Sequence, residues 1–412
     1  MKNQVKINGD RLMRSIFELG RFGGLEGGGV SRLALTEADR QARDYVANRM
    51  REMDMSVWVD GIGNIIGTYA GNEDLPPVMM GSHIDTVAAG GLYDGNYGVL
   101  SGLEVVAALK DQDCRLRRPV AVGVFTNEEG VRFQPDMLGS LVFAGGCSLE
   151  EALATTDQEG LSVAEALRGI GYHGPEPVTG FPVDRYIELH IEQGPILDLE
   201  KCPIGVVEGV QGISWTEFTL TGQANHAGTT PMNMRHDAGY VAAKIMARAY
   251  ELALGLGSGQ HATVGRISEF GPGMVNVIPD KVVFTVDLRN YREEVLQEAE
   301  KELFSFAEAL AAEHGVGCER KSLARFQPVV FAEEITGLIR AEAEAMGLGY
   351  RVLPSGAGHD AQMLARVCPS GMIFVPNKDG ISHNIKEHAE PEDLITGAEL
   401  LRRVVMSLAD RP

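Results

Sequence analysis

The fold of this chain is decided by PPVMMGSHID, residues 76–85, and by the two segments that follow it. A short apolar run that leaves a proline pair and ends in polar residues is typical of a buried strand. Residues 97–112, YGVLSGLEVVAALKDQ, have the pattern of a helix, and residues 118–130, RPVAVGVFTNEEG, repeat the buried-strand pattern. The order strand, helix, strand predicts a mostly parallel sheet with helices on both faces.

The same pattern extends to both sides of this unit. Upstream, residues 35–53 have apolar residues at helical spacing behind Thr36, a residue type that caps helix N-termini. Downstream, YIELHIEQG at 186–194 alternates as a third strand. After Pro328 two helical segments, 333–347 and 392–410, flank a strand at 368–376. We therefore predict an α/β main domain made of residues 1–209 and 329–412.

Residues 210–328 have a different pattern and predict an inserted domain. Strand patterns at 214–223, 261–270 and 280–290 alternate with helical patterns at 237–254 and 293–315. The order is βαββα, with room for a further short strand near Cys318. This order predicts a small, ferredoxin-like α+β domain.

Composition excludes several classes of protein. The 412 residues carry a net charge of −20, and so acidic a surface repels nucleic acids and anionic membranes. No run approaches 18 apolar residues, so no transmembrane helix is expected. The five cysteines are scattered, as is typical of reduced thiols, and the first 20 residues lack the apolar core of a signal peptide. We expect a cytoplasmic protein.

Histidine and acidic side chains follow the predicted strands. In an α/β sheet, ligands gather beyond the carboxyl ends of the strands. Three imidazoles and a set of carboxylates there suit two zinc-like ions about 3.5 Å apart, with one carboxylate left as a base. Taken singly, a histidine at a strand end is usually structural and a Glu-Glu pair is usually solvated. The hypothesis of a metal site therefore depends on the whole set of candidate residues at these strand ends. Its members are His83, Asp85, Asp94, Glu128, Glu129, His190 and His383.

Seven motifs, in this order along the chain, resemble those of the hydantoinase/carbamoylase family of amidases. That family belongs to the di-zinc aminoacylase and carboxypeptidase superfamily. ELHIEQGPIL and NHAGTTPM are specific to the family, whereas the HIDT motif and the glutamate pair are shared more widely. The motifs are GSHIDTV (81–87), YDGNYGVL (93–100), TNEEGVRF (126–133), ELHIEQGPIL (188–197), NHAGTTPM (225–232), SGAGHDAQ (355–362) and DGISHN (379–384).

The resemblance implies a role for each candidate ligand. His83 and His190 would hold one ion, Glu129 and His383 the other, and Asp94 would bridge them. Asp85 would orient a ligand and Glu128 would be the general base. The resemblance also implies a cis peptide bond between Asp94 and Gly95. The ions would be two divalent metals, zinc first, with manganese, cobalt or nickel as alternatives.

The resemblance further implies a substrate pocket and a homodimer formed through the inserted domain, which would also act as a lid. Arg289 would bind a substrate carboxylate, although an arginine at a strand end also suits a surface ion pair. His226 would stabilise an oxyanion, although alone it is only a loop histidine. His359 also fits a structural role. The implied pocket residues are Gln193, His226, Asn276, Arg289 and the loop that contains Gly358 and His359.

The implied activity is metal-dependent hydrolysis of N-carbamoyl-L-amino acids to the L-amino acid, CO2 and ammonia. Four alternatives stay open: an allantoate amidohydrolase, a β-ureidopropionase, a peptidase or aminoacylase, and a metal-binding relative without catalysis. Ile385 stands where relatives often have proline, and residues 212–215 lack an arginine found in some allantoate enzymes. Ala361, in contrast, is more typical of allantoate enzymes.

Overall fold

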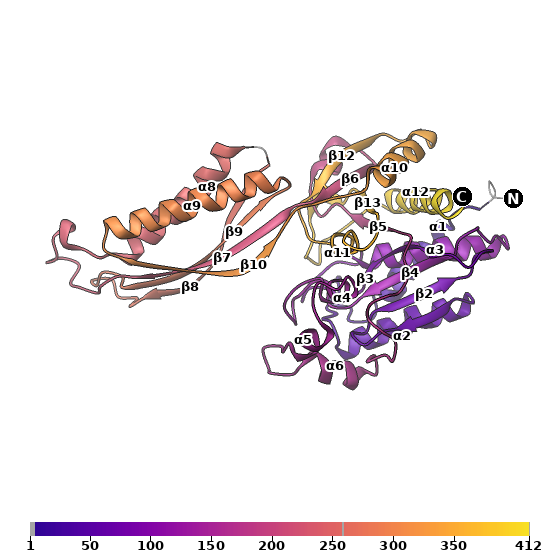
Figure 1. The fold of residues 1–412 in the computed structure, drawn as a ribbon, viewed down its shortest axis with the longest axis horizontal. Coiled ribbons are helices and arrows are strands. Elements are labelled where there is room, and N and C mark those ends of the chain that lie inside the picture. Colours follow the sequence, from indigo (N-terminus) through magenta and orange to yellow (C-terminus); the bar gives the residue numbers. More distant parts are fainter. Residues whose placement is uncertain (1–4, 258, 412) are drawn as a thin grey trace. The chain divides into compact units, whose positions relative to one another are not determined.

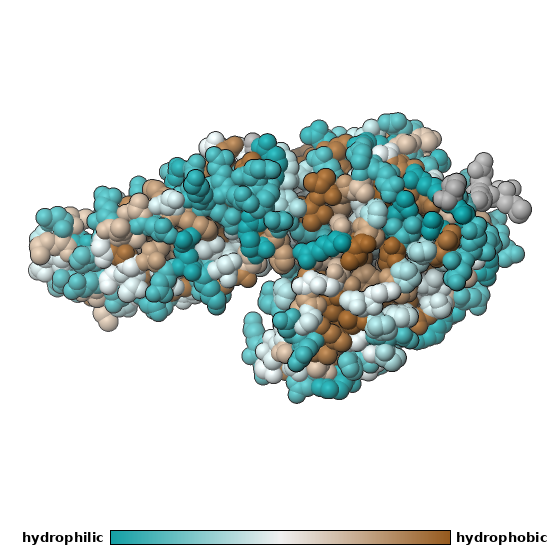
Figure 2. Space-filling model, in the orientation of Figure 1, coloured by the Kyte–Doolittle hydropathy of each residue, from teal (hydrophilic) through white to brown (hydrophobic). Residues whose placement is uncertain are grey.

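The computed structural model describes residues 5–257 and 259–411, which form two compact units. The first extends to Gly209 and resumes at Val330, and the second is Val210–Val329. Both have the predicted α/β and α+β character, and the fold class is confirmed (Figure 1). Hydrophilic side chains cover much of the visible face in Figure 2, in line with the strongly negative net charge. Within the described residues, no helix is long and apolar enough to cross a bilayer.

The first unit is built around a mixed sheet with the order β1-β2-β4-β3-β5-β13-β6-β11, and β12 pairs with β6. The central strands β4, β3, β5 and β13 are parallel, whereas β2 and β6 join antiparallel to them. The strands are β1 (Ser56–Val59), β2 (Ile65–Tyr69), β3 (Val78–His83), β4 (Val120–Phe125), β5 (Arg185–Ile191), β6 (Ile204–Val210), β11 (Val329–Val330), β12 (Tyr350–Ser355) and β13 (Ser370–Val375).

Helices cover both faces of this sheet. On one face α3 and α12 pack against apolar side chains such as Leu189 and Val375. On the other, α4 and α11 lie over Phe125 and Glu188. The helices of this unit are α1 (Gly9–Leu19), α2 (Glu37–Glu52), α3 (Asn96–Asp111), α4 (Leu138–Phe143), α5 (Leu149–Ala154), α6 (Val163–Ile170), α7 (Ile196–Glu200), α10 (Glu333–Ala345), α11 (Asp360–Leu364) and α12 (Pro391–Ala409). Because both faces are covered, the parallel strands are buried along almost their whole length.

The second unit is a four-stranded antiparallel sheet with the order β10-β7-β9-β8. Its chain order is β7 (Gly212–Thr221), α8 (Ala238–Leu256), β8 (His261–Gly271), β9 (Lys281–Asn290), α9 (Glu293–Glu313) and β10 (Gly317–Phe326). The strand near Cys318, expected to be short, is ten residues long and completes the ferredoxin-like βαββαβ order. The apolar sides of α8, α9 and the sheet form a separate core around Phe218 and Phe284.

Candidate metal centre

The candidate ligands of the first unit converge at the carboxyl ends of its parallel strands. His83 is the last residue of β3, and His190 is the last but one of β5. Glu128 and Glu129 follow β4, and His383 lies in the loop after β13. Asp94 comes from the turn that leads into α3. Adjacent parallel strands end at one edge of the sheet, so residues almost 300 positions apart in sequence meet there.

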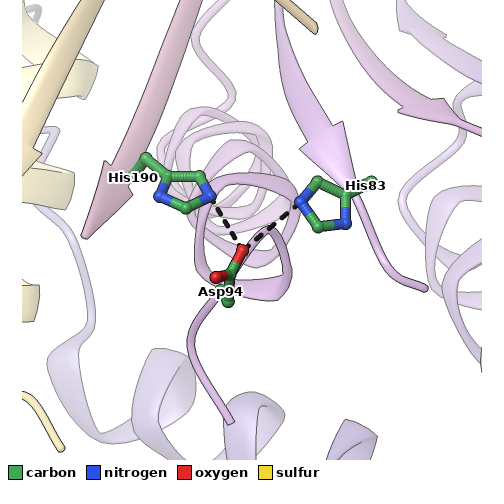
Figure 3. Close-up of side chains that lie close together, drawn as sticks. All are labelled: His83, Asp94 and His190. Atoms are coloured by element: carbon green, nitrogen blue, oxygen red, sulfur yellow. Dashed lines mark ion pairs between the residues drawn. The ribbon is translucent and has the colours of Figure 1, made fainter. Parts of the chain in front are cut away.

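One group consists of His83, Asp94 and His190, all buried (Figure 3). Oδ1 of Asp94 lies 3.5 Å from Nε2 of His83 and 3.2 Å from Nε2 of His190. Two ligands bound tetrahedrally to zinc at their usual bond lengths are about 3.3 Å apart. The spacing of these three donor atoms therefore fits a single ion.

A second group consists of Asp94, Glu129 and His383. Nε2 of His383 lies 3.4 Å from Oδ2 of Asp94 and 3.2 Å from Oε2 of Glu129. Half of the His383 side chain is exposed, and its backbone has a positive φ of 53°. Asp94 belongs to both groups, each through a different oxygen, so the donors fit two ions that share one carboxylate.

Hydrogen bonds present the Nε2 atoms of the two buried histidines to the centre. Nδ1 of His83 lies 2.9 Å from the backbone carbonyl of Asp85, and Nδ1 of His190 lies 2.8 Å from that of Ile191. A carbonyl only accepts, so each Nδ1 carries the proton and donates it. In the neutral ring Nε2 then has a lone pair for a metal, the usual arrangement of metal-bound histidine.

Glycine is required at position 95, where the chain turns from Asp94 into α3. Gly95 has φ of 64°, and a Cβ there would lie 2.4 Å from the ring of His83. The expected cis bond is wrong: among the described residues the cis peptide bonds are Gln134–Pro135 and Gly271–Pro272, so Asp94–Gly95 is trans. The left-handed glycine provides the reversal without the cost of a cis bond before a residue other than proline.

The carboxylate of Asp85 contacts the backbone of the glutamate pair rather than the ring of His83. Its Oδ1 lies 3.9 Å from Nδ1 of His83, which instead contacts the Asp85 backbone. The carboxylate accepts the backbone N–H groups of Glu128 and Glu129, at 3.2 and 3.3 Å. Asp85 therefore fixes the glutamate pair with its side chain and His83 with its carbonyl.

The charges of the cluster balance through shared hydrogen bonds. Burial alone would raise the pKa of Asp94, but its hydrogen bonds with His190, His383 and His83 hold that pKa well below its usual range. Burial alone would lower the pKa of His83, but the carboxylates of Glu128, Asp94 and Asp85 raise it well above the ordinary value. Hydrogen bonds with Asp94 and Glu129 raise the pKa of His383 to about 10. The site is thus built to hold positive charge among carboxylates.

Glu128 lies beside the ligands without joining either group. Its Oε2 atom is 3.4 Å from Nε2 of His83, and the residue is 8% exposed. Burial is the main reason that the pKa of Glu128 is well above the usual range, and the neighbouring Asp360, Glu129 and Asp94 add to it. A buried carboxyl with a raised pKa suits a general base that later acts as an acid.

Two hydrogen-bond donors to Asp94 come from outside the predicted ligand set. Nε2 of Gln193, a predicted pocket residue, donates to Oδ2 of Asp94 at 2.7 Å. The hydroxyl of Ser382 lies 2.9 Å from the same oxygen and 3.0 Å from Oε2 of Glu387. Ser382 and Glu387 were not predicted as site residues; the only signal was their place next to His383.

The Gly358–His359 loop lies against the first group of ligands. His359 is buried, its Nε2 is 2.9 Å from the hydroxyl of Ser355, and its ring centre is 4.7 Å from that of His190. Burial and the neighbouring His190 hold the pKa of His359 well below the ordinary value, so the ring is neutral. His359 therefore packs against a candidate ligand.

The remaining predicted residues lie in the second unit. The backbone N–H groups of Gly228 and Thr229 point at Nδ1 of His226, at 3.0 and 3.2 Å, so the proton of the neutral ring is on Nε2. The His226 loop pairs with the loop of Asn276 through the N–H of Ala227, 2.9 Å from the Asn276 carbonyl. Arg289 lies apart from them on β9.

Arg289 is held by a carboxylate two residues away on the same strand. Its Nε and Nη2 atoms both lie 3.0 Å from Oδ2 of Asp287, and its guanidinium lies 5.9 Å from the ring centre of Trp215. The ion pair foreseen as the alternative for Arg289 is therefore present, and it also fixes the direction of the guanidinium.

Comparison with known proteins places the chain in a family. Residues 79–407 match the model of peptidase family M20/M25/M40. An N-carbamoyl-L-amino-acid amidohydrolase of Rhizobium meliloti is 41% identical over 98% of this chain and 97% of its own length. A ureidoglycolate hydrolase of Oryza sativa subsp. japonica is 34% identical over 98% of this chain and 85% of its own. The crystal structure of a hydantoinase/carbamoylase family amidase from Burkholderia multivorans superposes with a TM-score of 0.93, at 42% identity over 99% of both chains.

The chain belongs to peptidase family M20/M25/M40 and, within it, to the hydantoinase/carbamoylase amidases. It is an enzyme of the amidohydrolase class. The family is metal-dependent, and the donor groups described above suit a metal.

Proposed function

We propose that the protein hydrolyses the ureido C–N bond of N-carbamoyl-L-amino acids and releases the L-amino acid, CO2 and ammonia. The carboxylate of Asp94 supports this proposal most directly, because it presents one oxygen to each of two groups of ligands. Relatives named for this reaction support the substrate class.

His83 and His190 would hold one divalent ion, and Glu129 and His383 the other, with Asp94 between them. Zinc is the first candidate for this donor set, ahead of manganese, cobalt and nickel. When bound, such ions would supply Lewis-acid chemistry, which polarises a carbonyl and lowers the pKa of bound water.

Glu128 would act as the base and then as the acid. Its buried carboxylate would take a proton from the attacking water and return it to the nitrogen that leaves. The carbamate that remains would decompose to CO2 and the second amine. Asp85 holds the backbone of this glutamate pair, and so fixes where the proton is received.

His226, Asn276 and Arg289 would recognise the substrate. The Nε2–H of His226 and the amide of Asn276 are donors suited to the developing oxyanion. Arg289, directed by Asp287, would bind the α-carboxylate through its planar guanidinium. Gln193, Gly358 and His359 would line the pocket beside Asp94 and His190.

The second unit would form a homodimer and act as a lid. Its helix α8 has exposed side chains at spacings of three and four residues, the repeat of a packed helix pair. These are Tyr240, Ala243, Ala247, Tyr250 and Leu254. The neighbouring edge strand β8 exposes Ile267 and Phe270. An apolar stripe beside an open strand edge is a surface that needs a partner. We also place the enzyme in the cytoplasm.

A side-by-side assay tests the substrate assignment. Ammonia release would be measured from N-carbamoyl-L-methionine, N-carbamoyl-β-alanine, allantoate and ureidoglycolate, with the same metal-loaded preparation. The highest kcat/KM is expected for N-carbamoyl-L-methionine. A preference for one of the other three would move the enzyme to that activity, and no turnover of any of them would contradict the proposal.

A further inference from the structure

Glu387 is a buried carboxylate between the turn of Asp94 and the loop of His383. It is 6% exposed and lies in the segment that joins His383 to α12. Its Oε1 atom accepts the backbone N–H groups of Tyr93 and Asp94, at 3.0 and 3.2 Å. Its Oε2 atom lies 3.0 Å from the hydroxyl of Ser382, the residue directly before His383. One side chain thus contacts both ligand-bearing segments.

The turn of Asp94 is shaped around this carboxylate. A Cβ at Gly91 would lie 2.1 Å from Oε1 of Glu387, so the backbone approaches the carboxylate more closely than any side chain would allow. In the other segment, the N–H of Glu387 donates to the carbonyl of Asn384 at 3.0 Å and closes a tight turn just after His383. Movement of Glu387 would therefore move both segments.

Ser382 extends the connection to the candidate metal centre. Its hydroxyl lies 3.0 Å from Glu387 and 2.9 Å from Oδ2 of Asp94, the oxygen that faces His383. Partners that hold a metal ligand in place are important for affinity, because a ligand that is free to rotate loses entropy on binding.

We propose that Glu387 is a positioning residue that sets the spacing between Asp94 and His383, and hence the affinity for the second ion. This inference rests on the proposed two-metal function. Glu387 touches the backbone of one ligand and the neighbour of the other, and no proposed ligand is replaced when it is changed.

Zinc titration of the metal-free, full-length protein against a chromophoric chelator tests the proposal. Glu387→Ala should weaken the binding of one of the two zinc ions by about 10- to 100-fold, the usual effect of losing a residue that holds a metal ligand in place. Glu387→Gln keeps the shape of the side chain and one acceptor for the two N–H groups, so it should retain more affinity than alanine. Glu390→Ala is the matched control, because that carboxylate is exposed three residues further on. It should bind both ions like the wild type.

Ser382→Ala gives a second route if Glu387→Ala does not fold, since Ser382 is only partly buried. The same selective weakening of one ion would support the inference. Wild-type dissociation constants in every folded Ser382 and Glu387 variant would overturn it and leave the two-metal function intact. A wild-type protein that binds fewer than two zinc ions would overturn both.

Discussion

Oδ2 of Asp94 lies 3.4 Å from Nε2 of His383, while the other oxygen of the same carboxylate faces His83 and His190. The two oxygens of Asp94 therefore belong to different ligand groups. Removal of Asp94 and removal of His383 should therefore have different effects on the number of bound ions.

Asp94→Ala should lose both ions, because each group loses a donor and the charge that balances the imidazoles. His383→Ala removes a ligand from one group only and should leave about one ion bound. Elemental analysis of dialysed proteins measures this directly. Equal metal contents in the two variants would contradict the sharing of Asp94.

Glu128→Gln should keep both ions and lower kcat at least ~100-fold, the usual scale for loss of a general base. The neighbouring change, Glu129→Gln, should instead reduce the metal content, because Glu129 lies in the ligand group of His383. Metal analysis and steady-state kinetics of both proteins separate the two roles. Loss of metal from Glu128→Gln alone would mean that the roles are exchanged.

Metal binding should release protons at pH 8. The pKa of His383 is raised to about 10, so this ring is protonated on both nitrogens at pH 8 in the metal-free protein. The pKa values of His83 and His190 are raised as well. Affinity should therefore rise with pH towards about 10 and fall in acid. Calorimetric titrations in buffers of different ionisation enthalpy count the protons. Binding without proton release at pH 8 would contradict the electrostatics of the site.

The same shift gives the metal-free protein a pH-dependent stability. Charged His383 is stabilised by Asp94 and Glu129, so its folded pKa lies above the unfolded value of 6.5. Its contribution is complete below pH 6.5 and disappears as the pH rises through about 10. The free energies of unfolding of the metal-free wild type and of His383→Ala, measured by denaturant titration, should converge at high pH. A difference in the free energy of unfolding that stays constant with pH would contradict the ion pairing of His383.

Arg289→Ala should cost on the order of 2–4 kcal/mol in kcat/KM, because a charged, hydrogen-bonded pair with the substrate is broken on one side. Arg289→Lys keeps the charge but loses the planar fork, so it should also be impaired. The metal content should be unchanged. A substrate with an esterified carboxylate should be poor with the wild type and should lose little more in the variants.

Asp287→Asn should impair turnover only when Arg289 is present, because Asp287 acts by directing that guanidinium. In the Arg289→Ala background it should add almost nothing. Kinetics of both single variants and the double variant complete the cycle. Additive losses would show that Asp287 has a role of its own.

The protein should sediment as a dimer at micromolar concentration. Tyr250→Glu or Leu254→Glu places a charge in the exposed stripe of α8 and should yield monomers. Leu199→Glu is the matched control, since Leu199 is 76% exposed on α7 in the first unit. Sedimentation velocity distinguishes the species, and a wild-type monomer would contradict the proposed interface.

Much of the fold could be predicted because the local signals agree with the tertiary structure. The run at 76–85 becomes β3, and Thr36 caps α2 (Glu37–Glu52) by accepting the N–H of Asp39. The buried strands could be recognised from their own apolar runs, without knowledge of the strands they pair with. The flanking strands β1 and β2 are short and were not predicted, because four or five residues carry too little periodicity.

Site residues could be predicted where a histidine or an acidic residue lies at the end of a predicted strand. They could not be predicted where their role depends on a contact with a segment distant in sequence. His83 and His190 are marked by their strand ends. Glu387 stands in the polar segment Lys386-Glu387-His388, which in sequence has the pattern of a solvated loop. Only folding brings its carboxylate against the N–H groups near Asp94.

Two bound metal ions should be needed for hydrolysis of a carbamoyl amino acid. Ammonia release from N-carbamoyl-L-methionine should be measured with protein stripped by a chelator and then titrated with zinc, manganese, cobalt or nickel. We expect no turnover without metal, and complete recovery of activity only at two equivalents of metal per chain. Turnover at the full rate by the metal-free protein would contradict it.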